Sequence, residues 1–326
     1  MRRLSALLSL LTASVAGHSS AAENLIQADI CIYGGTSGGV IAAVQAARMG
    51  HSVAVIEPGR HLGGMTSGGL SWTDVGSSDR VWVLGGLARE FYVRVGKHYG
   101  HPAEKALESP DTNRESGAGY DFAKPPSLSF EPRVAEAVFR EMVKETGVRV
   151  CFEAPIRDVR KVGATIRELV SGDGLRIRAK VYIDASYEGD LMAMAGVSCT
   201  LGREANAQYG ETCNGVQGPA LNPRAGRFDV SVSPYVVRDK PESGLLPYLV
   251  QPGALEAPGT ADKRIQSYNY RVTLTDNPTN RIFIQPPRNY NPANFELLAR
   301  WAEARQAAGK KLFLRDFLKY DPMQNG

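Results

Sequence analysis

The stretch Asp29–Glu57, DICIYGGTSGGVIAAVQAARMGHSVAVIE, joins a short apolar strand, a glycine turn, a small-residue helix and a second strand that ends in an acid. The helical part repeats small and branched residues at helical spacing on one face: Val40, Ala43, Val44 and Ala47. Small side chains on such a face let a helix lie close to a sheet. The stretch therefore predicts a βαβ unit with a parallel sheet.

The glycine turn predicts a phosphate site. Unpaired backbone N–H groups at a helix start bind a pyrophosphate, and the helix dipole favours negative charge there. Compared with the pattern G-x-G-x-x-G, Gly34 takes the first position and Gly39 the third. Thr36 stands at the second position, where a close backbone approach is expected. A simple βα loop with glycines for tight turning is the structural alternative.

Glu57 closes the second strand at the distance from the glycines where a carboxylate accepts hydrogen bonds from ribose hydroxyls. A negative charge at this position also disfavours a 2′-phosphate. The first βαβ unit is thus predicted to bind a dinucleotide without that phosphate.

A second glycine-rich loop, RHLGGMTSGG at 60–69, follows the ribose acid directly. With it the chain resembles FAD-dependent oxidoreductases that have a glutathione-reductase-like flavin domain. In that class an Arg-x-x-Gly-Gly loop runs along the pyrophosphate towards the flavin ring. The chain is most similar to bacterial FAD dependent oxidoreductases related to the flavin subunit of heterodisulfide reductase, in which a threonine at the second glycine position is common.

A third match is KVYIDASYEGDL at 180–191, which reads as a strand followed by a small-residue turn. It resembles the second signature of the flavin domain. The resemblance also implies that the chain near Ala154–Ile156 presents backbone groups to the adenine ring. The residues that the motifs and the resemblance together assign to FAD are Gly34, Gly35, Thr36, Ser37, Gly38, Gly39, Glu57, Arg60, Gly63, Gly64, Met65, Ser67, Ile156, Ala185 and Ser186.

The expected fold is α/β: a Rossmann-like FAD-binding domain, with a parallel sheet in a three-layer ββα arrangement, plus a β-rich substrate domain. Helices are predicted from Gly85 to Lys97 and from Glu131 to Glu145, and a strand at 148–152. A meander is predicted at 156–162, 164–170 and 175–179. The predicted organisation is a flavin domain at 23–196, a β-rich domain at 197–290 and a helical segment at 291–326.

The chain begins with a charged pair, Arg2–Arg3, then an apolar run and small residues, which is the pattern of a secretory signal. We expect cleavage after Ala22 and a periplasmic or extracellular protein, by the twin-arginine route or another. The apolar run is shorter than the roughly 20 residues of a spanning helix, so no membrane insertion of the mature chain is expected. Removing the pair changes the formal charge from +4 to +2, which gives no indication of nucleic-acid binding.

The four cysteines, Cys31, Cys151, Cys199 and Cys213, form no C-x-x-C motif. Their spacing lacks the Cys₄ pattern of an iron–sulfur cluster, and the histidines have no evident carboxylate or thiolate partners. No metal is expected. A disulfide between Cys199 and Cys213 is an open alternative in an exported protein.

The resemblance implies a return of the chain to the flavin domain through a Gly-Asp turn after the substrate domain. No such turn follows Pro287, so we expect a chain that is truncated relative to the complete family member, with a partial flavin site.

The leading hypothesis is an exported FAD-dependent oxidoreductase that moves a hydride or electron pair between a small organic substrate and an unidentified acceptor. No acid/base pair or nucleophile triad is evident, and the catalytic residues stay unknown. Weak candidates for the substrate side are Arg203, Glu204, Tyr209 and Glu211, for which a structural ion pair and surface positions are the alternative. The alternatives for the whole chain are an NAD-dependent dehydrogenase and a truncated non-catalytic nucleotide-binding remnant.

Overall fold

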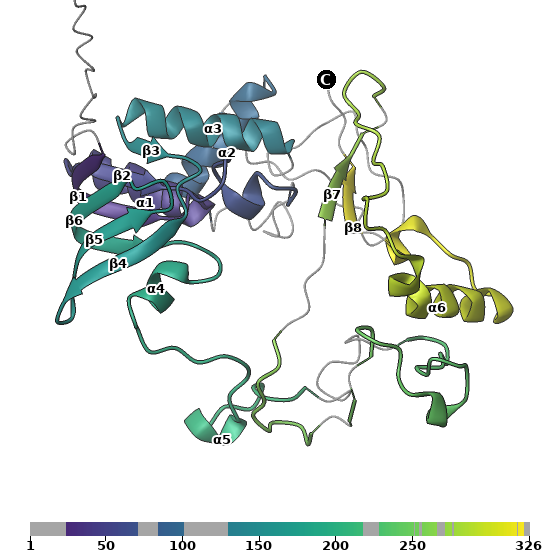
Figure 1. Cartoon of the computed structure of the whole chain (residues 1–326). Helices are drawn as coiled ribbons and strands as arrows, with labels where there is room; N and C mark the ends of the chain where they lie inside the picture. Colours follow the sequence, from purple (N-terminus) through teal and green to yellow (C-terminus); the bar gives the residue numbers. More distant parts are fainter. Residues whose placement is uncertain are drawn as a thin grey trace, which may run out of the picture. The chain divides into compact units, whose positions relative to one another are not determined.

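The computed structural model describes residues 24–70, 84–100, 130–217, 228–250, 252–253, 256–265, 271–275, 277–317 and 319–322. The chain divides into two compact units (Figure 1). The first comprises Met1–Leu62 and Met142–Gly196, and the second comprises Gly63–Glu141 and Val197–Gly326. The predicted signal segment and most of the polar loop at 100–126 lie outside the described residues.

The first unit is built on a six-stranded sheet with the order β3-β2-β1-β6-β5-β4. Its strands are β1 (Leu25–Tyr33), β2 (Val53–Ile56), β3 (Arg149–Cys151), β4 (Ile156–Val162), β5 (Thr165–Ser171) and β6 (Arg176–Asp184). β1 pairs in parallel with β2 and β6, and β2 pairs in parallel with β3. β4, β5 and the start of β6 form the antiparallel meander.

One strand replaces two that the sequence predicted. Residues 175–179 and 180–184 were expected as a meander strand and a separate signature strand, but both belong to β6. The reason lies in the pairing. β6 runs beside β1 from Leu25↔Arg176 to Tyr33↔Asp184, and only its first residues also pair with β5. A single strand therefore connects the meander to the parallel sheet.

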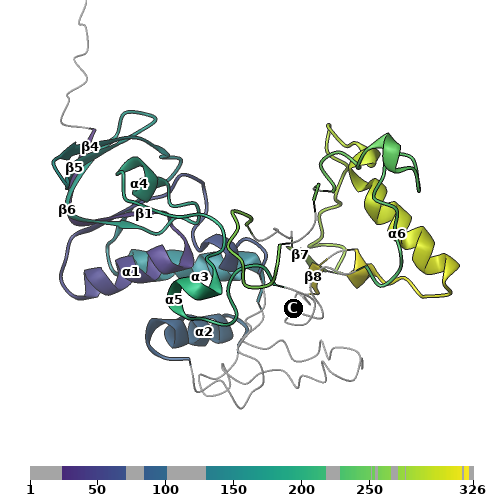
Figure 2. The same ribbon diagram turned by 90° about the horizontal axis from the view of Figure 1, so that it is seen from below.

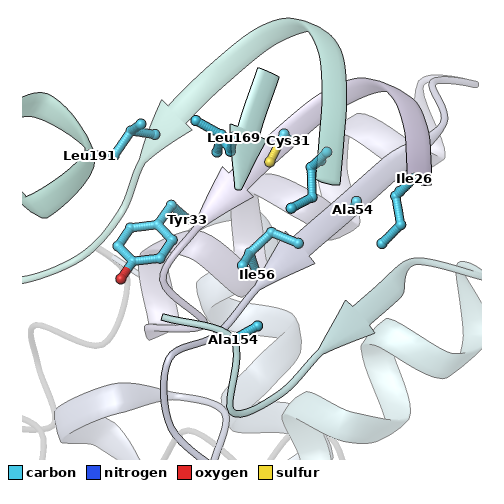
Figure 3. Close-up of a cluster of buried hydrophobic side chains, with 9 residues drawn as sticks. Ile26, Cys31, Tyr33, Ala54, Ile56, Ala154, Leu169 and Leu191 are labelled. Atoms are coloured by element: carbon cyan, nitrogen blue, oxygen red, sulfur yellow. The ribbon is translucent and has the colours of Figure 1, made fainter. Parts of the chain in front are cut away.

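The first unit has three layers, and the ββα arrangement is confirmed. Helix α1 (Ser37–Arg48) covers one face of the parallel strands, and β4 and β5 lie on the other side (Figure 2). Between the parallel sheet and the meander lies an apolar core, with Cys31, Ile56, Leu169 and Ile177 fully buried (Figure 3). Tyr33 closes this core next to Leu191 of helix α4 (Asp190–Met194). The burial of apolar surface stabilises this arrangement.

The two helices predicted in the middle of the chain are present as α2 (Gly86–His98) and α3 (Pro132–Glu145). Val134, Val138 and Met142 are buried on one face of α3, as their spacing predicted. Aromatic rings join the two helices, because Phe91 of α2 stacks on Phe139 of α3 with ring centroids 4.5 Å apart. A 3-10 turn, η1 (Gly64–Thr66), precedes them in the chain.

The β-rich character predicted for 197–290 is not seen in the described part of that region. Only β7 (Arg271–Leu274) is a strand there, and it pairs in parallel with β8 (Lys319–Pro322). Two isolated bridges, Arg203↔Asp262 and Tyr235↔Leu245, make short links. Prolines, glycines and polar side chains that bond nearby backbone explain why longer ladders do not form.

The remaining elements are short, apart from one helix. They are α5 (Asn206–Tyr209), η4 (Pro241–Ser243), η5 (Pro292–Phe295), α6 (Glu296–Ala307) and η6 (Leu314–Asp316). Within the helical segment predicted at 291–326, α6 is the main helix, and the 3-10 turn η5 leads directly into it. No helix among the described residues is long and apolar enough to span a membrane.

Candidate dinucleotide-binding site

The turn between β1 and α1 can accept only glycine at its two ends. Gly34 has φ +100°, and a Cβ atom there would lie 2.7 Å from the amide nitrogen of Ser186. A Cβ at Gly39 would lie 2.0 Å from the carbonyl oxygen of Gly34. Both distances are far shorter than van der Waals contact. Packing inside the first unit therefore requires glycine at these two positions, in addition to the access that a ligand needs.

The start of α1 offers backbone donors. Thr36 is its N-cap, and the Thr36 Oγ1 accepts a hydrogen bond from the Gly39 amide at 3.2 Å. The Val40 amide donates to the Thr36 carbonyl and begins the regular helix ladder. The first amides of a helix have no intrahelical partner, which leaves those of Ser37 and Gly38 as donors at the positive end of the helix dipole. This geometry fits a diphosphate.

Glu57 lies beside the turn at the end of β2. One carboxylate oxygen accepts from the Gly35 amide at 2.6 Å, and the other accepts from the Gly59 amide at 2.6 Å. A carboxylate has about four lone-pair positions, so both oxygens keep capacity for further donors such as ribose hydroxyls. The two amides fix the carboxylate in orientation. Leu62, which is buried, packs against Gly35 from the same side.

Two other predicted cofactor residues have partners in the first unit. Arg60 donates from Nε to the Glu153 carboxylate at 2.7 Å, and both side chains are exposed. The Ile156 amide donates to the buried hydroxyl of Tyr33, whose pKa is raised mainly by burial. The Ala154 amide donates to the Glu57 carbonyl at 3.1 Å. The chain at 153–156 is therefore tied to the ends of β1 and β2.

The turn after β6 contains a network that the motif comparison missed. One Asp184 oxygen accepts from the Ser186 amide and hydroxyl at 2.9 and 2.7 Å, and the other accepts from the Met192 amide at 2.8 Å. The Ser186 hydroxyl in turn accepts from the Gly189 amide at 3.0 Å. Asp184 and Ser186 thus cap the start of α4. The sequence signal was Asp-x-Ser shortly before a helix that begins with an acid.

The predicted residues of the first unit meet at one edge of the sheet. Gly34, Glu57 and Ala185 each follow the carboxyl end of a parallel strand, namely β1, β2 and β6. The carboxyl edge is where ligands bind in open α/β sheets. The strand order therefore brings these three turns to one edge of the sheet.

The predicted loop residues Gly63, Gly64, Met65 and Ser67 belong to the second unit. Gly63 has φ +101°, and a Cβ atom there would lie 2.6 Å from the Phe139 ring. The Ser67 hydroxyl donates to the Gly64 carbonyl at 3.3 Å, which closes η1. Met65 is exposed at the start of this turn. The loop is thus tightly wound on α3.

The weak catalytic candidates have local partners. Arg203 forms an ion pair with Asp262 and two backbone hydrogen bonds with the same residue. The ion pair raises the pKa of Arg203 and lowers that of Asp262. Glu204 and Glu211 both accept from the side-chain amide of Asn214, and Tyr209 is exposed. These contacts are those of a folded surface segment.

The thiols do not form disulfides or metal sites in the described residues. Cys31 and Cys151 lie in β1 and β3, and burial raises the pKa of Cys31 to about 12. Cys199 and Cys213 are exposed free thiols, so the alternative of a disulfide between them is not realised here. Within the described part of the chain, no group of three His, Cys, Asp or Glu residues could hold a metal ion.

Parts of this chain are similar to solved structures of several enzymes. L-proline dehydrogenase from P. horikoshii aligns with 55% of this chain and 58% of its own, at 17% identity and a TM-score of 0.37. L-amino acid deaminase from Proteus vulgaris aligns with 54% of this chain and 52% of its own, at 17% identity and a TM-score of 0.36. Thioredoxin reductase from T. acidophilum aligns with 48% of this chain and 34% of its own, at 18% identity and a TM-score of 0.28.

The chain thus spans between about a third and three fifths of these solved chains. No curated protein matches the sequence.

The fold and the glycine turn define a Rossmann-like flavoprotein. Residues 29–323 match the family described as FAD dependent oxidoreductase, which is nearly the whole chain. The protein belongs to this family, and its cofactor is FAD. Membership of the FAD dependent oxidoreductase family, which the motifs predicted, is confirmed.

Proposed function

We propose that the carboxyl edge of β1, β2 and β6 holds the adenylate and diphosphate of FAD. The observation that carries the proposal is the Glu57 carboxylate held between the Gly35 and Gly59 amides, beside a helix start without side-chain obstruction. Glu57 would accept hydrogen bonds from the ribose hydroxyls, and the amides of Ser37 and Gly38 would donate to the diphosphate. The residues of the first unit that we assign to FAD are those predicted from the sequence: Gly34, Gly35, Thr36, Ser37, Gly38, Gly39, Glu57, Arg60, Ile156, Ala185 and Ser186.

When bound, FAD supplies a two-electron acceptor for a small organic substrate. The protein's own residues bind and orient it. The amides at the start of α1 compensate the diphosphate charge, and Glu57 sets the position of the ribose. Asp184 and Ser186 hold the turn after β6 against Gly34 through the cap of α4. The proposal specifies the substrate only as a small organic molecule and leaves the electron acceptor unidentified.

Export is a further part of the proposal. The pattern at 1–22 supports a secretory signal and a periplasmic or extracellular mature chain. The N-terminal sequence of the protein recovered from outside the cytoplasm tests this. A mature chain that begins at Glu23 supports it, and a full-length chain retained in the cytoplasm contradicts it.

The FAD site is tested by an absorbance spectrum of the purified full chain. A band at about 450 nm that persists through dialysis supports it. Glu57→Gln replaces the carboxylate, which accepts from two amides, by a neutral side chain. Hydrogen bonds to charged groups contribute about 1.5–3 kcal/mol. We therefore expect roughly 10- to 100-fold weaker FAD binding for this variant.

Glu136→Gln is the matched control, because Glu136 pairs with Arg140 on the surface of α3. It should bind FAD as the wild type does. Equal FAD binding by Glu57→Gln and the wild type contradicts the assignment of the ribose acid. Anaerobic addition of candidate reductants, with loss of the 450 nm band as the readout, then identifies the substrate class.

A further inference from the structure

Thr36 occupies the position where the dinucleotide fingerprint has its second glycine. Its backbone is ordinary for any residue, with φ −63° and ψ 170°. The side chain is almost fully buried. It therefore does not stand in the path of a diphosphate, and glycine is not required here for conformation.

The Thr36 hydroxyl has two partners that lie far apart in the sequence. It donates to the Ala185 carbonyl at 2.8 Å and accepts from the Gly39 amide at 3.2 Å. Ala185 begins the turn after β6, and Gly39 lies in the first turn of α1. The hydroxyl thus joins two turns at the carboxyl edge of the sheet.

The other contacts between these turns are made by backbone. The Ala185 amide donates to the Tyr33 carbonyl at 2.8 Å, and Gly34 lies against Ala185 and Ser186. A glycine at position 36 would keep those contacts but leave the Ala185 carbonyl without its hydroxyl donor. The amides of Ser37 and Gly38 directly follow Thr36, so their direction depends on how firmly this residue is held.

We propose that Thr36 is a positioning residue for FAD: its hydroxyl connects the α1 start to the Ala185 turn and so preorganises the amides that receive the diphosphate. The proposal rests on the FAD site described above. It reverses the usual expectation for the fingerprint, because the consensus glycine at this position weakens FAD binding in this chain. Binding improves when the bound arrangement exists beforehand.

A simple helix cap would behave differently. Replacing a threonine N-cap by glycine changes stability by only a few tenths of a kcal/mol, so a cap alone predicts nearly unchanged FAD binding for Thr36→Gly. A connection that includes Ala185 predicts a clear loss, since a part-buried carbonyl loses its hydrogen-bond donor. Thr36→Ser keeps the hydroxyl and should rescue binding.

The experiment measures the rate at which FAD leaves the purified full-length holoprotein, from the rise of flavin fluorescence after dilution. We expect release about tenfold faster for Thr36→Gly and Thr36→Val, and within about threefold of wild type for Thr36→Ser. Thr146→Val is the matched control, because the Thr146 hydroxyl also bonds backbone carbonyls in the first unit, at the end of α3. Its release rate should equal that of the wild type.

Hydrogen exchange of the peptide at 184–192 gives the second readout. In Thr36→Gly it should exchange faster than in the wild type, whereas a cap confined to α1 would leave it unchanged. Equal release by wild type and Thr36→Gly, unchanged exchange at 184–192, or equal acceleration by Thr146→Val each overturns the proposal. A wild type without FAD refutes the proposed cofactor site itself, which is a separate outcome. If Thr36→Val does not fold, Thr36→Gly provides the same test.

Discussion

The glycine turn after β1 and the segment that α6 holds in the second unit are fixed by opposite means. At the turn, the absence of side chains at Gly34 and Gly39 lets backbone from β1, α1 and β6 meet. On α6, one long side chain supplies the hydrogen bonds that hold the neighbouring segment. The buried Arg300 donates to the carbonyls of Ser233, Tyr235 and Val236, and it also donates to the Glu296 carboxylate.

This difference explains which changes each region tolerates. A turn made of bare backbone fails when an atom is added, because the neighbouring backbone cannot move away. A segment held by a guanidinium fails when atoms are removed, because several part-buried carbonyls lose their donor together. Additions should therefore damage the first region, and truncations the second.

The largest expected effect is that of Gly34→Ala. The new Cβ would meet the Ser186 amide at 2.7 Å and the Ala185 carbonyl carbon at 2.8 Å, at a φ of +100°. We expect FAD to be absent from the purified variant and the melting temperature to fall, because backbone must shift. The flavin-to-protein absorbance ratio and circular dichroism measure both.

Gly172→Ala is the control for this substitution. A Cβ there would meet its nearest atom, the Pro155 carbonyl oxygen, at 3.7 Å, which is ordinary contact. Full flavin content in Gly34→Ala would contradict the packing argument for the turn.

Arg300→Met tests the other side of the comparison. Methionine fills part of the volume but leaves three carbonyls unpaired, so we expect a loss of about 2–4 kcal/mol in local stability. Hydrogen exchange should rise in the peptide at 233–246. Arg300→Lys should not restore protection, because an ammonium lacks the planar fork. Arg288→Met, at an exposed arginine, serves as the control. Similar hydrogen exchange at 233–246 in all three variants would show that the Arg300 hydrogen bonds do not hold this segment.

A smaller effect is expected at Glu168, where ion pairs stabilise the first unit. This buried carboxylate binds Arg176, Arg178 and Arg160, and the hydrogen bond from Arg176 is the main reason that its pKa lies below the usual 4.5. Because the folded state favours the ionised form, the stabilisation is complete above pH 4.5 and is lost as the pH falls through the lowered pKa.

Glu168→Gln should therefore cost about 1–2 kcal/mol at neutral pH, a value reduced by the partial exposure of the arginines. The melting-temperature difference from the wild type should shrink below pH 4.5. Glu188→Gln, an exposed acid of the first unit, is the control. A difference that stays constant with pH would contradict the role of the carboxylate charge.

The smallest effect concerns the reactivity of the thiols, which can be measured without a substitution. Only the thiolate reacts with maleimides. Cys31 is buried with a pKa of about 12, and Cys199 and Cys213 are exposed. We expect labelling of the exposed pair alone in the folded protein at neutral pH, read by peptide mass spectrometry. Fast labelling of Cys31 before unfolding would show that the sheet core is looser than described.

The local patterns of the first unit predicted α1 and the hairpin of β4 and β5, but they divided β6 into two strands. The spacing of Val40, Ala43 and Val44 gave α1, and the short turn at Gly163 gave the hairpin of β4 and β5. At 197–290, apolar residues between prolines and glycines satisfy a strand pattern, but the described residues there form only β7 and two isolated bridges. Pairing is a long-range property that a local pattern does not contain.

The sequence by itself determined the βαβ unit, the acid at Glu57 and the family, since each depends on residue types at short, fixed spacing. Only the tertiary structure decided that β6 is one strand, that Thr36 bonds Ala185, and that Arg300 serves three carbonyls. These hydrogen bonds join residues 64 to 149 positions apart. Their partners are chosen by how the layers pack, and packing depends on the whole chain at once.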